Sequence, residues 1–317
     1  MDISSEIKKQ INNIKFEDNS VYLDQILNHI DRAEKYYIQG QQDEHFFNDV
    51  IYRSNQAFEG ALKEAYKVLA SKEEGELNNT TPYKIETHFK ENLIFRERVL
   101  QLFENYRQEW RNKSTHDYKI IFNESEAFIA LTSVSSFVHL LLKQIQEKLA
   151  FNKEQKILQE QKESLEQLKR TVLKINITLA EKISRLLNQF IERNEFLTKE
   201  SLTEIEILGM IHGFLSMTND EFDIVREPKI KINNGILRPD FIIEYDNEKV
   251  ILEIKKRFDK QRLESDKEQV LLYLESTEIT QGILYFIKTV EGKPFASIST
   301  ETYKRNNIEY KLFIIKT

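Results

Sequence analysis

The sequence predicts an α-helical N-terminal part, a long connecting helix, and a C-terminal α/β part in which helices flank a mixed sheet. Glycine and proline are scarce, at 8 and 4 in 317 residues, and such sparse helix breakers favour long helices. Three of the four prolines lie in the last third of the chain, where short apolar runs typical of strands also appear. The expected segments are 1–150, 151–198 and 199–317.

Composition is that of a globular protein, with 40% hydrophobic and 31% charged residues. Cysteine is absent, which excludes disulfides and thiolate metal sites and suits the cytoplasm. The N-terminus lacks the basic and apolar regions of a secretory signal. Because no uninterrupted apolar run approaches about 18 residues, we expect no membrane partner.

The net charge of −6, from 46 basic and 52 acidic residues, argues against a nucleic-acid binder that is always active. It leaves room for a local basic cluster, and one occurs late in the chain: Lys255, Lys256, Arg257, Lys260 and Arg262. This cluster is either a phosphate-contacting patch or the solvated start of a helix.

Periodicity predicts the clearest helices of the first part at about 18–38, 43–70, 83–110 and 124–150. The loop after the third of these contains Arg111 and His116, separated by four residues. The pair resembles the Arg…His motif of HEPN domains, and the resemblance covers roughly residues 20–150. Asn55 and Glu59 lie on a segment that resembles the earlier HEPN helix whose polar residues face the motif.

The HEPN resemblance implies metal-independent cleavage of RNA. His116 would exchange the proton of a 2′-hydroxyl, and Arg111 would neutralise charge that develops on the phosphate. Glu59 or Asn55 would orient these side chains, and the family's usual site between two protomers implies a homodimer. The alternative is that Arg111 and His116 only cap helix carbonyls or pair with nearby acids.

Residues 151–198 carry apolar side chains at seven-residue spacing: Leu158, Leu165, Val172, Leu179 and Leu186. This spacing predicts a long helix that pairs either with a partner chain or with the protein's own helical bundle. A semi-rigid helical connector between domains is the alternative.

The C-terminal part contains two apolar runs, 241–245 and 250–254, separated by the polar residues 246–249. They predict a β-hairpin. Alternation along a strand places Glu253 and Lys255 on one face. With a turn centred on residues 247 and 248, we expect Asp240 to lie near Lys255 and within reach of Glu253.

Such a hairpin end could hold a hard cation, Mg²⁺ or Mn²⁺. Asp240 and Glu253 would be its carboxylate ligands, and the carbonyl of Ile254 could add an oxygen. Lys255 would position the attacking water and the phosphate. Pro239-Asp240 followed by Glu253-Ile254-Lys255 resembles the motif of PD-(D/E)XK nucleases, which have the restriction-endonuclease-like fold. The resemblance covers roughly residues 200–317.

Segments on both sides of the hairpin agree with this resemblance. Such families often carry an extra acidic ligand on the preceding helix, for which Glu204 is the candidate. Gln269 and Tyr273 share a helical face and resemble the Gln…Tyr pair of RecB-like members. Further strands are expected at 281–288 and 310–316, with 289–309 irregular.

Together the resemblances imply a metal-dependent nuclease that acts on DNA, as in prokaryotic defence against phages or plasmids. The N-terminal part would serve dimerisation, sensing or RNA cleavage, and a protein partner or trigger could activate the enzyme. Two alternatives remain. One is an HEPN endoribonuclease with a nucleic-acid-binding C-terminal domain. The other is a non-catalytic scaffold whose long helix recruits a partner.

Overall fold

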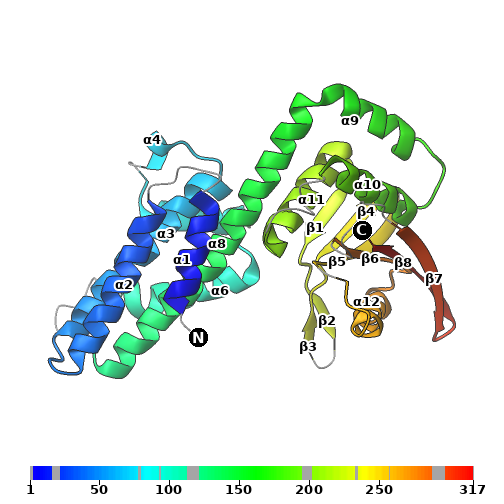
Figure 1. Ribbon diagram of the computed structural model, residues 1–317. Coiled ribbons are helices and arrows are strands. Elements are labelled where there is room, and N and C mark those ends of the chain that lie inside the picture. Colours follow the sequence, from blue (N-terminus) through cyan, green and yellow to red (C-terminus); the bar gives the residue numbers. More distant parts are fainter. Residues whose placement is uncertain are drawn as a thin grey trace. The chain divides into compact units, whose positions relative to one another are not determined.

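The computed structural model describes residues 3–15, 22–77, 80–92, 94–112, 121–194, 202–232, 235–256, 258–287 and 297–316. The chain divides into two compact units, Met1–Leu149 and Ala150–Thr317. The first unit is helical and the second contains a mixed sheet with helices (Figure 1). The predicted order, α followed by α/β, is therefore confirmed at this level.

The first unit is built from helices joined by short connections. They are α1 (Ile3–Lys15), α2 (Leu23–Gly40), α3 (Phe46–Leu69), α4 (Glu74–Leu77), α5 (Pro82–Glu91), α6 (Glu97–Tyr106), the π-helical η1 (Arg107–Arg111) and α8 (Glu124–Glu160). The single helix expected over 83–110 is interrupted after Asn92, whose side chain donates to the carbonyl of His88. Beyond the break, Phe95 turns into the core and packs on Phe89 with a centroid separation of 4.3 Å.

Aromatic side chains from α3, α6 and α8 form the centre of this unit. The ring of Phe58 lies 4.8 Å from that of Tyr106 and 5.1 Å from that of Phe137. All three are almost completely buried. This packing holds η1, which follows Tyr106 directly, against α3.

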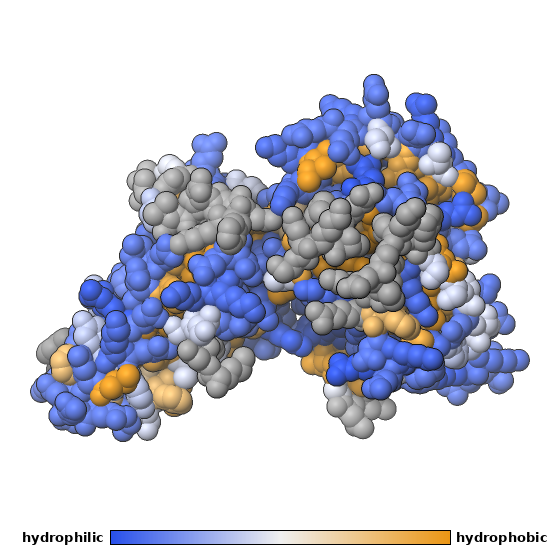
Figure 2. All heavy atoms as spheres, viewed as in Figure 1, coloured by the Kyte–Doolittle hydropathy of each residue, from blue (hydrophilic) through white to orange (hydrophobic). Residues whose placement is uncertain are grey.

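By length and composition, α8 could cross a membrane, and it is the one such helix in the part of the chain that the structure describes. Half of its most apolar 18-residue window is buried inside the structure, where Val134, Phe137 and Leu141 are fully enclosed. A core helix has this character. The helix itself was predicted at 124–150, but its membrane-like composition was not, because polar residues interrupt the apolar stretch. On the face seen in Figure 2 the surface is predominantly hydrophilic, with separate apolar side chains.

The second unit begins within α8 and includes most of the segment expected to be a connector. Its helices are α9 (Lys162–Leu168), the π-helical η2 (Lys169–Leu173), α10 (Leu179–Arg193), α11 (Glu204–Thr218) and α12 (Leu263–Thr277). The side chains at seven-residue spacing, Leu158 to Leu186, are buried in the same core as the strand residues Phe241 and Leu252. The apolar stripe is therefore buried in the protein's own second unit, where η2 packs on α10 and α10 packs on the sheet.

Among the described residues, six strands form the main sheet in the order β1-β4-β5-β6-β8-β7. The strands are β1 (Asp223–Arg226), β4 (Phe241–Tyr245), β5 (Glu248–Lys255), β6 (Gln281–Phe286), β7 (Ser297–Arg305) and β8 (Ile308–Lys316). β5, β6 and β8 are parallel neighbours, and the other pairings are antiparallel. A separate ribbon joins β2 (Ile230–Ile232) to β3 (Gly235–Leu237). Helices α10 and α11 cover one face of the sheet, and α12 covers the other (Figure 1).

Two expectations about strands were wrong. Residues 297–305 are not irregular, because they form the edge strand β7. Its sequence, SISTETYKR, is largely polar and exposed, so it lacks the apolar alternation that identifies a buried strand. The β4–β5 turn was also misplaced: Asp246 and Asn247, with φ of 49° and 62°, close a two-residue turn that pairs Tyr245 with Glu248.

The corrected register brings Asp240 beside Glu253 instead of Lys255. The partner shifts by two residues, from 255 to 253, so every side chain keeps its face of the sheet. Glu253 and Lys255 therefore still share the face that α12 covers, as expected from alternation.

Candidate functional site

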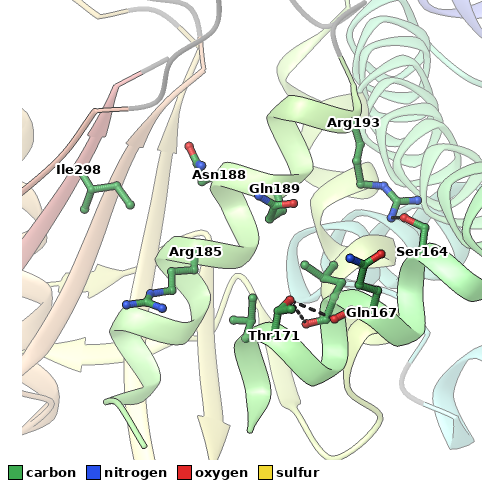
Figure 3. Close-up of a pocket in the computed structure, with 10 residues that line it drawn as sticks. Ser164, Gln167, Thr171, Arg185, Asn188, Gln189, Arg193 and Ile298 are labelled. Atoms are coloured by element: carbon green, nitrogen blue, oxygen red, sulfur yellow. Dashed lines mark hydrogen bonds between the residues drawn. The ribbon is translucent and has the colours of Figure 1, made fainter. Parts of the chain in front are cut away.

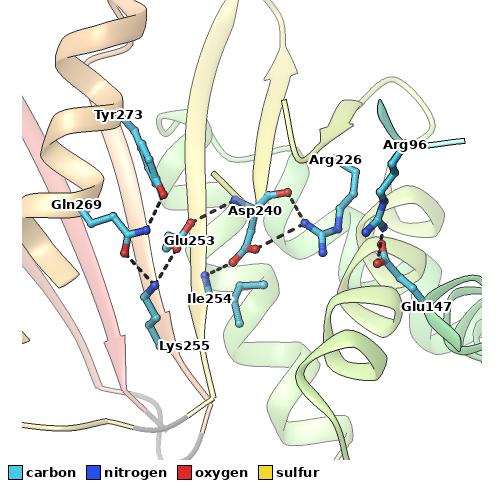
Figure 4. A network of polar contacts seen from close by, with 9 residues as sticks. All are labelled: Arg96, Glu147, Arg226, Asp240, Glu253, Ile254, Lys255, Gln269 and Tyr273. Atoms are coloured by element: carbon cyan, nitrogen blue, oxygen red, sulfur yellow. Dashed lines mark hydrogen bonds and ion pairs between the residues drawn. The ribbon is translucent and has the colours of Figure 1, made fainter. Parts of the chain in front are cut away.

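The ends of β4 and β5 bring the two predicted carboxylates together. The backbone N–H of Ile254 donates to Oδ2 of Asp240 at 2.8 Å, and the backbone N–H of Asp240 donates to Oε2 of Glu253 at 3.2 Å (Figure 4). Each carboxylate thus accepts a hydrogen bond from a backbone N–H of the neighbouring strand. This reciprocal bonding orients both side chains toward the edge where the two strands separate.

A chain of polar contacts continues from Glu253 to α12. Lys255 Nζ donates to Oε1 of Glu253 at 2.8 Å and to Oε1 of Gln269 at 2.9 Å. Gln269 Nε2 in turn donates to the Tyr273 hydroxyl at 2.6 Å. The structure therefore joins Asp240, Glu253, Lys255, Gln269 and Tyr273 in one network (Figure 4).

Arg226 belongs to this site and was missed from the sequence. Its Nη1 donates to the carbonyl of Asp240 at 2.7 Å and lies 3.6 Å from the Oδ1 of the same residue. The guanidinium also stacks over Phe241, 4.7 Å from the ring centroid. Arg226 comes from β1, and only the pairing of β1 with β4 brings it here. No local pattern in the sequence reports that pairing.

Glu204 begins α11 and lines a cavity of about 630 Å³ together with Lys255. The nearby acid Glu206 forms part of the N-terminal cap of α11, because its carboxylate accepts from the backbone N–H of Thr203 at 2.6 Å. The charge of Glu204 is one contributor to the raised pKa of Asp240. Glu204 is therefore within electrostatic reach of the site, as the helix pattern suggested.

Burial and the adjacent Glu253 carboxylate raise the pKa of Asp240 to about 7, against the opposing effects of Arg226 and the Ile254 N–H. The side chains of Asp240 and Glu253 are 17% and 7% exposed, so solvent screens their repulsion poorly. For Lys255, burial lowers the pKa, but the charge and hydrogen bond of Glu253 outweigh it and raise the pKa overall. Two crowded carboxylates therefore stand beside a firmly protonated lysine.

The donor set suits a hard divalent cation. Within the described ranges no three Asp, Glu or His side chains form a cluster that could hold a metal ion, and Asp240 and Glu253 are the two carboxylates that the strand ends bring together. The N–H of Ile254 points to Asp240, and in a strand the carbonyl of the same residue faces the same neighbour. Mg²⁺ commonly takes one or two carboxylates and completes its shell with water and substrate phosphate.

The cavity next to Lys255 is lined by charged side chains. Besides Glu204 and Lys255, its lining consists of Lys256, Phe258, Asp259, Lys260, Arg262 and Asp266. Most of the expected basic cluster therefore surrounds one cavity, while Arg257 lies outside the described residues. Asp266 was missed, although its spacing from Gln269 and Tyr273 along α12 puts it on the same helical face.

The second predicted site lies in the first unit. Arg111 ends η1, and its Nε lies 3.4 Å from Oε1 of Glu59 on α3. One turn earlier on α3, Asn55 accepts from the Tyr106 hydroxyl at 2.9 Å. The predicted proximity of Glu59 to Arg111 is therefore present. His116 lies outside the described residues.

Comparisons of the chain with protein-family models, with curated proteins and with solved structures found no match. Membership of a nuclease or HEPN family thus stays an expectation from the motifs. The geometry around Asp240, Glu253 and Lys255 is the strongest support for a function.

Proposed function

We propose that the second unit is a metal-dependent nuclease that hydrolyses DNA phosphodiesters. The observation that carries the proposal is the hydrogen-bonded array of Asp240, Glu253 and Lys255 at adjacent strand ends. These residues have the order and spacing of the PD-(D/E)XK motif, and a restriction-endonuclease-like fold is part of the proposal.

Asp240 and Glu253 would hold Mg²⁺ or Mn²⁺, with the Ile254 carbonyl and Glu204 as further oxygen donors. The bound cation would supply Lewis acidity toward water and the scissile phosphate. Lys255 stays protonated because its pKa is raised, so its ammonium donates to a phosphate oxygen or to the attacking water. Gln269 holds that ammonium in place, and Tyr273 holds the amide of Gln269.

Basic side chains beside the site would bind the flanking phosphates of the substrate strand. Lys256, Lys260 and Arg262 line the cavity of about 630 Å³ that Lys255 also lines. Their positive charge opposes the net charge of −6 of the whole chain. Binding of DNA is therefore expected at this cavity and to weaken as salt rises.

Lys255→Ala is the decisive variant, and Lys249→Ala is its matched control. Both remove a lysine from β5, but Lys249 pairs with Glu244 at 2.7 Å at the far end of the strand. Each protein is incubated with DNA and RNA in Mg²⁺, Mn²⁺ or EDTA. We expect the wild type and Lys249→Ala to cleave DNA only with metal, and Lys255→Ala to lose at least about 100-fold. Cleavage of DNA in EDTA, or full activity of Lys255→Ala, would refute the proposal.

A second candidate is metal-independent cleavage of RNA by an HEPN-like first unit that forms a homodimer. It is favoured by the approach of Glu59 to Arg111 at 3.4 Å. Arg111→Ala and His116→Ala would each abolish RNA cleavage in EDTA and leave metal-dependent cleavage of DNA unchanged. Loss of both activities in either variant would contradict two separate sites.

The biological role that we propose is defence of a prokaryotic cytoplasm against phages or plasmids, with a trigger or protein partner that activates the nuclease. The net charge of −6 supports control by a trigger, because an acidic chain binds free DNA weakly. Efficiency of phage plating on cells that express wild type or Lys255→Ala tests the role. Equal plating on both strains would argue against it.

A further inference from the structure

A second cavity, of about 490 Å³, lies in the second unit between the α9–η2 segment and α10 (Figure 3). It shares no lining residue with the cavity beside Lys255. α10 packs on the face of the sheet opposite α12. Neither nuclease chemistry nor the expected connector accounts for this cavity.

One face of α10 lines the cavity with polar side chains at helical spacing, namely Arg185, Asn188, Gln189 and Arg193. The opposite face of α10 is apolar and buried in the core beneath. The two arginines are eight residues apart, which separates their backbones by about 12 Å along the helix axis. They therefore lie toward the two ends of the cavity.

The facing wall is also polar. Ser164 and Gln167 from α9 and Thr171 from η2 line the cavity at the spacing of one helical face. Two packed helices normally bury apolar stripes against each other. Here two polar stripes line the cavity from both sides and meet at one end, where Arg193 contacts Ser164. Leu168, Val172 and Ile298 supply the apolar part of the lining.

Two arginines and no acidic residue are among the described residues that line the cavity. Arg193 donates to the neutral oxygens of Ser164, at 3.2 Å, and Gln161. Arg185 is exposed and forms no ion pair with any residue in the described part of the chain. α10 carries two acids, and both already accept hydrogen bonds. Glu181 accepts from the backbone N–H of Thr178 at 3.0 Å, and Glu192 accepts from the amides of Asn188 at 3.0 Å and Gln189 at 2.7 Å.

We propose that this cavity is a binding site for a small phosphate-bearing ligand of nucleotide size. Arginine binds phosphate through planar, bidentate hydrogen bonds, and neither guanidinium forms an ion pair with a carboxylate of the described residues. The amide of Gln167 can donate to and accept from the edge of a base or the hydroxyls of a sugar. The amide nitrogens of Asn188 and Gln189 donate to Glu192, and their oxygens can accept from the same groups of a ligand. The apolar lining and the volume suit a planar ring system.

The test measures binding by isothermal titration calorimetry with the full chain in EDTA, which keeps metal away from the Asp240 site. The probes are AMP, the 5′-phosphorylated dinucleotide pApA, and adenosine as the ligand without phosphate. The variants are Arg185→Gln and Arg193→Gln. Arg170→Gln is the matched control, because Arg170 is an exposed arginine on η2 that does not line the cavity.

We expect AMP or pApA to bind the wild type and Arg170→Gln equally. Adenosine should bind at least tenfold more weakly, and each of the two cavity variants should lose at least tenfold in affinity. Three outcomes would overturn the proposal: no binding of either phosphorylated probe, binding that Arg185→Gln and Arg193→Gln leave unchanged, or an equal loss in Arg170→Gln. All of these outcomes are independent of whether the chain cleaves DNA.

Discussion

Asp240 accepts a hydrogen bond from the backbone N–H of Ile254 at 2.8 Å, which fixes its carboxylate to the end of the neighbouring strand. The bond belongs to the strand pairing as much as to the site. Replacement of Asp240 by alanine would therefore disturb β5 as well as remove a charge. Asparagine preserves an acceptor oxygen, so Asp240→Asn is the cleaner substitution.

Asp240→Asn should flatten the dependence of stability on pH. The pKa of Asp240 is raised to about 7 in the folded protein, so the folded state holds a proton that the unfolded chain releases near the ordinary aspartate pKa of 3.8. Stability of the wild type thus falls as pH rises between these values. We expect the fall in Tm from pH 5 to pH 8 to be smaller in Asp240→Asn. In the wild type at pH 8, added Mg²⁺ should raise Tm. If Tm fell equally with pH in the wild type and in Asp240→Asn, ionisation of Asp240 would not be the cause of the fall.

Gln269→Ala should reduce DNA cleavage through Lys255 and not through folding. Gln269 accepts from Lys255 Nζ at 2.9 Å and donates to the Tyr273 hydroxyl at 2.6 Å. Loss of a residue that orients an essential group typically costs 10–100-fold. We expect a decrease in kcat on the order of tenfold with unchanged Tm, and a smaller decrease in Tyr273→Phe. A larger effect of Tyr273→Phe than of Gln269→Ala would contradict a chain of contacts in which Tyr273 acts on Lys255 only through Gln269.

Gly213→Ala should destabilise the second unit. A Cβ at Gly213 would lie 2.6 Å from the backbone carbonyl oxygen of Phe151. A backbone atom cannot shift aside as easily as the end of a flexible side chain. Overpacking of this kind costs about 1–3 kcal/mol in the free energy of unfolding, measurable with urea. Gly75→Ala in α4 is the control, because nothing lies within 4 Å of its added Cβ. If Gly213→Ala were neutral, residues 150–160 would not pack on α11.

Glu154→Gln should stabilise the protein at alkaline pH. Burial raises the pKa of Glu154 to about 7, and its Oε2 has no hydrogen-bond partner among the described residues. The folded state therefore loses stability as pH rises from about 4 through 7, where the buried carboxyl must ionise. Chemical unfolding at pH 5 and pH 8 should show a gain on the order of 1 kcal/mol only at pH 8. A gain of equal size at both values would exclude ionisation as the cause.

Much of the site could be predicted because its signals are local. Alternation along 250–255 placed Glu253 and Lys255 on one face, and i,i+4 spacing placed Gln269 beside Tyr273. The register of the hairpin was missed because Asp246 and Asn247 both adopt positive φ and close a two-residue turn. With this turn, the partner of Asp240 on β5 is Glu253, two residues before the expected Lys255. The tendency of Asp and Asn toward this conformation could have indicated the shorter turn.

By itself the sequence determined the helical and strand periods, and with them which side chains share a face, because these depend on neighbours a few residues apart. Tertiary structure decided the rest: that Arg226 of β1 meets Asp240, that the stripe from Leu158 to Leu186 is buried in the core of the second unit, and that Arg185 and Arg193 line a cavity. Those contacts join segments that are distant along the chain. Which apolar surface meets which is settled by burial over the whole unit, and periodicity does not encode it.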